Sequence, residues 1–159
     1  MSSKSIEIAF PKFLPVFAIN YRFSDAYSSY AGEVDEAALR YYMFCGDAVL
    51  TTGHESIALD WGWVPLLDLA WCLRDVGQDV RAQEEAAFDF TESAERLLFH
   101  RTGEALRITC TFSDQTLELP VAAFEAGVQA FYKAIVEEAL HRHPSLQGNE
   151  HFCRYAAAT

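Results

Sequence analysis

The segment over residues 64–77 places the strongest limit on the fold. Its apolar side chains fall on nearly every face of a helix, Pro65 suits the first helical turn, and Gly77 suits the end. A helix that is apolar all round has no face for solvent, so other elements must cover it on most sides. We therefore expect a buried central helix here, followed by a polar and acidic loop or frayed turn over residues 78–86.

Short runs of β-branched and aromatic residues lie on both sides of this segment and predict strands. The predicted strands cover residues 6–10, 16–23, 38–44, 48–52, 56–61, 87–91, 96–100, 106–112 and 116–119. Turn residues separate neighbouring runs, with Gly46-Asp47 predicted as a hairpin turn and Gly53-His54-Glu55 as the next turn. Short connections of this kind favour antiparallel meanders.

A second helical pattern begins at Pro120. From Val121 onward, apolar residues recur at helical spacing and polar residues line the opposite face, which predicts an amphipathic helix packed on the sheet. The expected organisation is a single α+β domain over residues 1–146, with antiparallel meander sheets, one buried central helix and one C-terminal amphipathic helix. A loosely ordered tail is predicted over residues 147–159.

The charge of the chain limits its ligands. Lys and Arg total 12 against 23 Asp and Glu, which gives a formal net charge of −11 over 159 residues. Such a field repels the phosphates of nucleic acids and anionic lipids and attracts cationic surfaces. We expect no nucleic-acid ligand, and no membrane insertion because Asp68 and Arg74 interrupt the best apolar stretch. Pro11, Lys12 and Pro15 break the apolar N-terminal stretch, so we expect no signal peptide and a cytoplasmic protein.

Acidic and aromatic residues are interleaved over residues 25–60, and a second acid-rich stretch covers residues 75–95. Aromatic side chains supply much of the energy of a protein interface, and acids steer a basic partner toward it. The coincidence predicts a binding surface for a basic protein, although an acidic solubility coat has the same composition. The candidate partner-binding residues are Tyr30, Glu33, Asp35, Glu36, Asp47, Glu55, Asp60, Trp61, Trp63, Asp79, Glu84 and Glu85.

Two groups of residues offer a catalytic or metal-binding alternative. Cys45 with His54 and an acid such as Asp47 has the residue types of a thiol nucleophile, a base and an orienting carboxylate. The histidines and the cysteine between His141 and Cys153 have the types of zinc ligands, but their spacing matches no standard finger. The eight glycines form no nucleotide-binding fingerprint, and no cofactor is expected. A third alternative is a homo-oligomeric structural subunit, so both a monomer and a homodimer stay open.

The order of the elements also resembles a known group of proteins. The features are a strand reading Tyr21-Arg22-Phe23-Ser24-Asp25, a helix from Pro65-Leu66-Leu67-Asp68-Leu69 to Leu73, a meander, and an amphipathic helix opening near Leu119-Pro120. This pattern covers most of the chain and resembles small uncharacterised bacterial proteins found among the immunity proteins of polymorphic and contact-delivered toxins. The resemblance implies a small, acidic, cytoplasmic, non-catalytic protein that neutralises a cognate toxin by occluding its basic active site. It carries over no functional residues, because the group has no shared active motif.

Overall fold

The structure, a computed structural model, describes residues 17–24 and 34–159 and has an α+β fold. Its strands are β1 (Phe17–Phe23), β2 (Cys45–Thr52), β3 (Ser56–Pro65), β4 (Glu85–Asp89), β5 (Arg96–Thr102), β6 (Ala105–Cys110) and β7 (Leu117–Pro120). Its helices are the π-helical turn η1 (Ala38–Met43), α2 (Leu66–Gln83), α3 (Val121–Arg142), the short 3-10 helix η2 (Pro144–Gly148) and α4 (Glu150–Ala157). No helix in this described part is long and apolar enough to cross a membrane.

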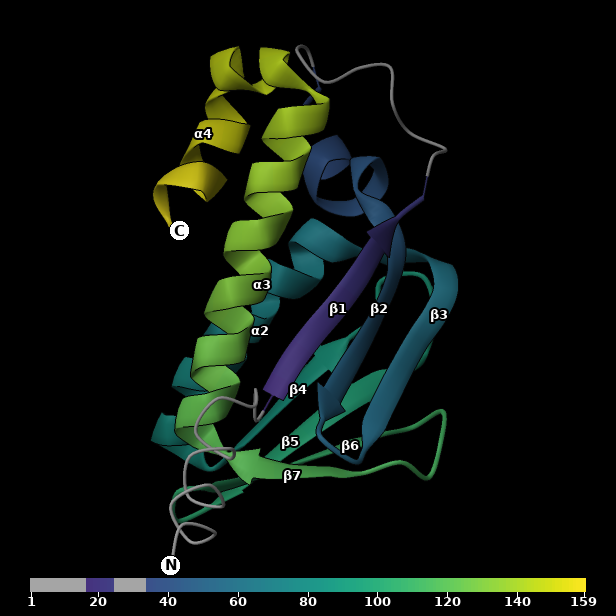
Figure 1. Cartoon of the computed structure of the whole chain (residues 1–159), viewed down its shortest axis with the longest axis vertical. Helices are drawn as coiled ribbons and strands as arrows, with labels where there is room; N and C mark the ends of the chain where they lie inside the picture. Colours follow the sequence, from purple (N-terminus) through teal and green to yellow (C-terminus); the bar gives the residue numbers. More distant parts are fainter. Residues whose placement is uncertain (1–16, 25–33) are drawn as a thin grey trace, which may run out of the picture.

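Both sheets are antiparallel meanders, which confirms the predicted fold class. Sheet A has the order β1-β2-β3 and sheet B the order β4-β5-β6-β7, and the two sheets lie beside the long helices α2 and α3 (Figure 1). Buried side chains from both sheets and from the helices form one hydrophobic core. The strand predicted over residues 6–10 lies outside the described residues.

The region around the start of β2 differs from the prediction. Residues 38–44 do not form a strand, because Leu39 and Met43 are buried four residues apart, which is a helical spacing, and the chain forms η1 there. Gly46-Asp47 is not a hairpin turn either, since β2 runs through both residues. The turn between β2 and β3 lies at residues 53–55, as the sequence predicts.

The central helix α2 is buried as predicted but is longer than expected. It continues through Gly77 to Gln83, and the capping residue Glu84 has a left-handed backbone with a φ of 68°. Val80 is fully buried and continues the apolar face past the glycine. The Nε of Arg101 donates to the Val80 carbonyl at 2.7 Å and so satisfies an acceptor at the helix end. The loop or frayed turn predicted over residues 78–86 is therefore wrong, because this stretch forms the last turns of α2 and the start of β4.

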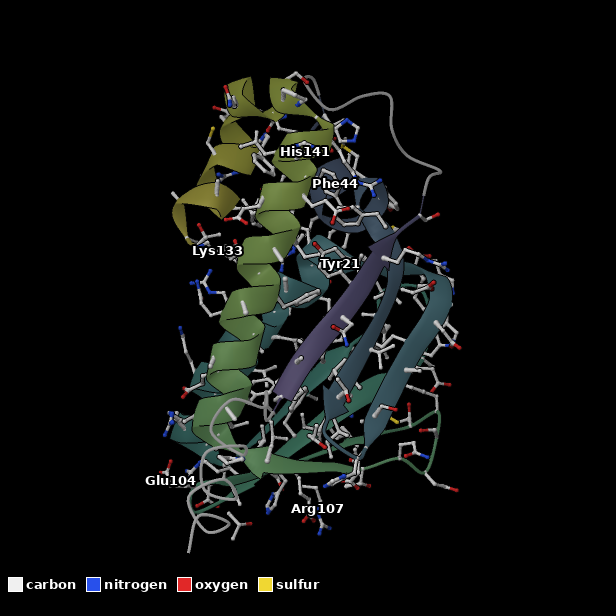
Figure 2. The ribbon with its side chains drawn as sticks, in the orientation of Figure 1. Tyr21, Phe44, Glu104, Arg107, Lys133 and His141 are labelled. Carbon is white, nitrogen blue, oxygen red and sulfur yellow. The ribbon has the colours of Figure 1, made fainter. Side chains whose placement is uncertain are left out.

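Helix α3 is the predicted amphipathic helix, and it packs on β1 and α2. Tyr21 of β1 reaches it and donates from its hydroxyl to Glu138 Oε1 at 2.9 Å (Figure 2). Gly127 allows the close approach of β1, because a Cβ at this position would lie 2.5 Å from Cδ2 of Phe17. A larger residue at position 127 would push the strand and the helix apart.

The chain after α3 folds into η2 and α4, so the prediction of a loosely ordered tail over residues 147–159 is wrong. Asn149 caps α4, because its Oδ1 accepts the N–H of Phe152 at 3.0 Å. Its Nδ2 donates to the carbonyl of Val34 at 2.9 Å, which connects α4 to the chain that enters η1. Phe152 and Tyr155 lie one turn apart on the same face and are both buried, which explains why the segment docks.

Candidate functional site

Strand β3 carries a bulge where it passes the start of β2. Residues 60–63 stand opposite Asp47 alone, because the register shifts between Gly46 and Ala48. The Oδ1 of Asp47 accepts the N–H of Gly62 at 2.7 Å, and the φ of Gly62 is 78°, a left-handed value that favours glycine. Bulges of this kind redirect the side chains of an edge strand.

The bulge carries Trp61 and Trp63 as a stacked pair. Their ring centroids are 5.0 Å apart and their planes differ by 13°. Trp61 also meets Phe90 and Phe112 edge-on, with centroid distances of 5.2 and 4.8 Å. These two phenylalanines follow β4 and β6, so Trp61 links the edge strand of sheet A to sheet B. Trp63 is half-buried at the end of this aromatic cluster.

The π-helical turn η1 carries two tyrosines that complete an aromatic surface with Trp63. The rings of Tyr41 and Tyr42 meet edge-on at 6.4 Å, and Tyr42 is 54% exposed. The Nε of Arg40 donates to Asp68 Oδ1 of α2 at 2.6 Å, and the Asp68 side chain is only 4% exposed. This buried ion pair attaches the turn to the central helix.

Tyr41, Tyr42, Cys45, Trp63 and Glu92 line a groove of about 380 Å³, which we call the aromatic groove. Its lining comes from η1, the start of β2, the bulge of β3 and the turn between β4 and β5. Three of the five side chains are aromatic and one is a carboxylate. Such a lining attracts cations, because the faces of aromatic rings are negative and the carboxylate adds a full charge.

The thiol of Cys45 is not an activated nucleophile. Burial, with a smaller contribution from the charge of Glu92, raises the pKa of this thiol to about 11, so it is protonated at neutral pH. Its Sγ donates to the carbonyl of Tyr41 at 3.3 Å. His54 lies in the turn at the other end of β2, about 30 Å away along an extended strand. The predicted pairing of Cys45 with His54 is therefore wrong.

The histidines and the cysteine between His141 and Cys153 do not form a ligand set. Nδ1 of His151 lies 2.6 Å from the guanidinium of Arg154, so this ring already has a partner on α4. Within the described part of the chain, no three His, Cys, Asp or Glu side chains lie close enough together to hold a metal ion.

Four of the predicted binding residues, Asp47, Asp60, Trp61 and Trp63, meet at the bulge of β3. The carboxylate of Asp47 is already used, because it holds the bulge and pairs with Arg22 at 2.9 Å. Asp60 is exposed and makes no ion pair with any residue that the structure describes. The bulge therefore presents one acid to solvent and uses the other to keep its shape.

Two predicted acids lie just before η1 and stabilise it. Asp35 caps the turn, because its Oδ1 accepts a backbone N–H at 2.8 Å. Glu36 accepts a hydrogen bond from the hydroxyl of Tyr155 at 3.3 Å. Tyr30 and Glu33 lie outside the described residues.

The remaining predicted acids lie in other parts of the fold, away from the bulge. Glu55 lies in the turn at the opposite end of β3. Asp79 and Glu84 lie toward the end of α2, with Asp79 about 20 Å along the helix axis from its first turn. Glu85 pairs across strands with His100 at 3.3 Å. These residues do not join the aromatic groove.

Four residues of the groove, Tyr41, Tyr42, Cys45 and Glu92, are absent from the predicted partner-binding set, and of these the sequence singled out only Cys45, for the catalytic alternative. The two tyrosines suit a strand by residue type, and the helical spacing of Leu39 and Met43 is the signal that could have placed them in a helical turn. Glu92 belongs to the acid-rich stretch over residues 75–95, but nothing in the sequence pattern connects it to Trp63.

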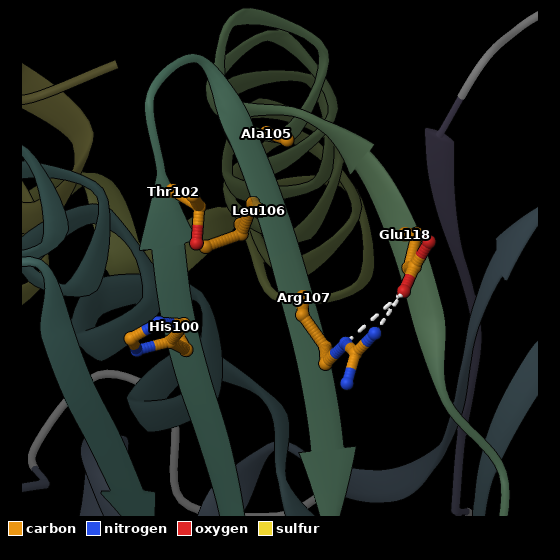
Figure 3. A pocket seen from close by; sticks show the side chains of 6 residues that line it. All are labelled: His100, Thr102, Ala105, Leu106, Arg107 and Glu118. Atoms are coloured by element: carbon orange, nitrogen blue, oxygen red, sulfur yellow. Dashed lines mark hydrogen bonds and ion pairs between the residues drawn. The ribbon is translucent and has the colours of Figure 1, made fainter.

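A second groove of about 370 Å³ lies on the outer face of sheet B (Figure 3). Across this face, Glu85, His100, Arg107 and Glu118 form one row over four neighbouring strands. Arg107 donates from its Nε to Glu118 Oε1 at 3.0 Å, and Nδ1 of His100 lies 3.3 Å from Oε1 of Glu85, so the side chains of the row contact one another. Cross-strand pairs of this kind stabilise a solvated sheet face, and we assign no ligand to this groove.

No protein-family model, curated protein or solved structure matches this chain. The resemblance to toxin-immunity proteins therefore stays a prediction from the order of the elements. What the aromatic groove can do follows from its own residues, which offer aromatic surface and a carboxylate but no activated nucleophile.

Proposed function

We propose that this chain is a non-enzymatic protein that binds a basic protein partner through the aromatic groove. The observation that carries the proposal is the groove itself, where Tyr42, Trp63 and Glu92 from three separate parts of the chain line one cavity. Aromatic side chains are frequent anchors of protein interfaces. The net charge of −11 favours a cationic partner over an anionic one.

The acids around the groove support a role in steering. Glu92 and Asp60 are exposed and make no ion pair with the described residues, whereas Asp47 pairs with Arg22 and Asp89 pairs with Arg96. The negative charge of an acid without an internal partner is not offset by a neighbouring cation, so it can attract an approaching one. Such steering raises the association rate more than the affinity, and salt screens it.

The partner class that we propose is a bacterial toxin with a basic active site. Such a site binds phosphates, and the carboxylates of an inhibitor can occupy the positions of those phosphates. The order of the elements, which resembles that of toxin-immunity proteins, supports this class. The alternative of an enzyme built on Cys45 has lost its support, because the thiol is protonated and His54 is distant.

A capture experiment from lysate of the native host tests the proposal. The wild-type chain is compared with Glu92→Lys and Trp63→Leu, and with Glu137→Lys as a control. Glu137 is exposed on α3, outside the groove lining, and its substitution makes the same change of charge as Glu92→Lys. We expect one dominant basic protein that high salt releases, that both groove variants lose, and that the control retains.

Other outcomes would count against the proposal. If Glu92→Lys and Glu137→Lys lost the captured protein equally, the overall acidic charge of the surface would bind the partner, and not the groove in particular. Retention by all variants would exclude the groove, and capture of nothing but a second copy of the chain would favour the homo-oligomer. Circular dichroism of each variant confirms that it is folded before the comparison is made.

A further inference from the structure

The lining of the aromatic groove suits one chemical group. Among the residues that the structure describes, Glu92 is the one acidic side chain of the lining, beside the thiol of Cys45, two tyrosines and Trp63. Trp61 stacks on one face of Trp63, with ring centroids 5.0 Å apart, so a ligand can contact only the part of the Trp63 indole that Trp61 leaves uncovered. Tyr42 is 54% exposed and adds a second accessible ring.

We propose that the groove receives the guanidinium group of an arginine side chain from the partner. The inference rests on the proposed function, because it names the partner residue that enters the groove. A cation is favoured by the negative ring faces and by Glu92, and no Lys, Arg or His of residues 17–24 and 34–159 lines the groove to oppose it. The guanidinium of Arg40 is held by Asp68 and lies 5.7 Å from the ring centroid of Tyr41, so the rings open to a partner arginine are those of Tyr42 and Trp63.

An arginine fits this lining better than a lysine does. A guanidinium is planar and weakly hydrated, so it can stack on a ring while its N–H groups donate to a carboxylate. An ammonium is a compact and strongly hydrated charge, which loses more when an aromatic surface displaces its water. The volume of about 380 Å³ also leaves room for the methylene stem of the side chain.

The chain itself shows the geometry that we expect. The guanidinium of Arg74 lies 5.2 Å from the ring centroid of Trp71 and 5.0 Å from that of Tyr132. Arg142 lies 5.1 Å from the ring centroid of Phe23. A partner arginine would occupy the same range of distances over the rings of the groove.

A small probe tests the inference on the full chain. N-acetyl-arginine amide is titrated while NMR follows the indole N–H signals of the three tryptophans, and the signal of Trp63 is assigned with Trp63→Phe. We expect the Trp63 signal to shift saturably, with a dissociation constant on the order of millimolar for so small a ligand. The signal of Trp71, which does not line the groove, should stay in place.

Matched probes and variants separate charge from shape. N-acetyl-lysine amide should bind more weakly, and N-acetyl-citrulline amide, which has the shape of arginine without the charge, should cause no saturable shift. Glu92→Gln should weaken binding of the arginine probe about threefold to tenfold. Glu137→Gln should leave it unchanged. No shift with the arginine probe, an equal shift with citrulline, or equal weakening by Glu137→Gln would each overturn the inference.

This test and the capture experiment can fail independently. If the arginine probe binds the groove but no basic protein is captured, the arginine site stands and the proposed function fails. If a basic partner depends on the groove but the arginine probe neither shifts Trp63 nor competes with that partner, the proposed function stands and the arginine site fails.

Discussion

The Nε of Arg40 lies 2.6 Å from Oδ1 of Asp68, and this contact joins the π-helical turn η1 to the buried helix α2. The side chains are 23% and 4% exposed, respectively. The guanidinium also donates to Sγ of Cys72 at 3.4 Å. Because Tyr41 and Tyr42 directly follow Arg40, the ion pair determines where one wall of the aromatic groove stands.

Removing one partner of this pair should destabilise the protein. Asp68→Ala leaves the Arg40 guanidinium without its counter-charge, and we expect the free energy of unfolding to fall by about 3 kcal/mol. The double variant Arg40→Met, Asp68→Leu replaces both charges with apolar groups and should recover most of the loss. Urea unfolding measures the free energy of unfolding of the wild type, of Asp68→Ala and of the double variant. An Asp68→Ala chain that unfolds at the wild-type urea concentration would show that the pair does not hold the turn.

Stability should fall at alkaline pH. Burial raises the pKa of the Cys45 and Cys72 thiols to about 11 each from 9.0, and that of Tyr132 to about 12 from 10.0. The unfolded chain therefore loses these protons at lower pH than the folded chain does. Their contribution to stability is complete below about pH 9 and is lost as the pH rises through about 11 to 12.

A series of urea unfolding curves checks this pH dependence. The midpoint should stay nearly constant from neutral pH to about pH 9 and then decline. The double variant Cys45→Ala, Cys72→Ala should show a shallower decline between about pH 9 and about pH 11. A midpoint that rises above pH 9 would contradict the account.

Two glycines inside long helices should respond in opposite directions to alanine. At Gly127 a new Cβ would lie 2.5 Å from Cδ2 of Phe17 and 3.0 Å from its carbonyl oxygen, so Gly127→Ala should cost about 1–3 kcal/mol. At Gly77 the nearest atom is 3.7 Å away, which is an ordinary contact, so Gly77→Ala should stabilise the protein by about 0.5–1 kcal/mol. Thermal unfolding measures the stability of each variant relative to the wild type. Stabilisation in both variants would mean that helix propensity, and not the approach of β1, decides the outcome.

Helix α4 should keep η1 in place through Asn149. Asn149→Ala removes the cap of α4 and the hydrogen bond to Val34, and it should cost about 1–2 kcal/mol. Hydrogen exchange should become faster in α4 and also in η1, because the two are connected through the lost bond. Faster exchange confined to α4 would show that the helix does not support the turn.

The sheets and the long helices are predictable because their patterns are local. In β5, Leu97 and Phe99 are buried between the exposed residues Arg96 and His100, and this period of two is visible in the sequence. Helix α3 is equally visible from its apolar residues at helical spacing. Such elements need no knowledge of distant parts of the chain.

The candidate site depends on contacts between distant residues, and for that reason the sequence predicts it only in part. By residue type, Tyr41 and Tyr42 suit a strand. In the structure they lie in the helical turn η1, which Arg40 joins to Asp68, a residue 28 positions away in the sequence. The groove also needs the register shift at Asp47, which composition does not encode. Composition did indicate the tryptophans of the bulge, and it could not indicate which acid would face them.

The central claim is that the aromatic groove binds a basic partner, and the dissociation constant of the captured partner tests it most directly. Titration calorimetry compares wild type, Glu92→Lys and Glu137→Lys at about 50 mM and about 500 mM salt. Glu92→Lys should weaken binding at least about tenfold at low salt, with a smaller difference at high salt, while Glu137→Lys stays within about twofold of wild type. An unchanged dissociation constant for Glu92→Lys, or an equal loss in both variants, would contradict the account.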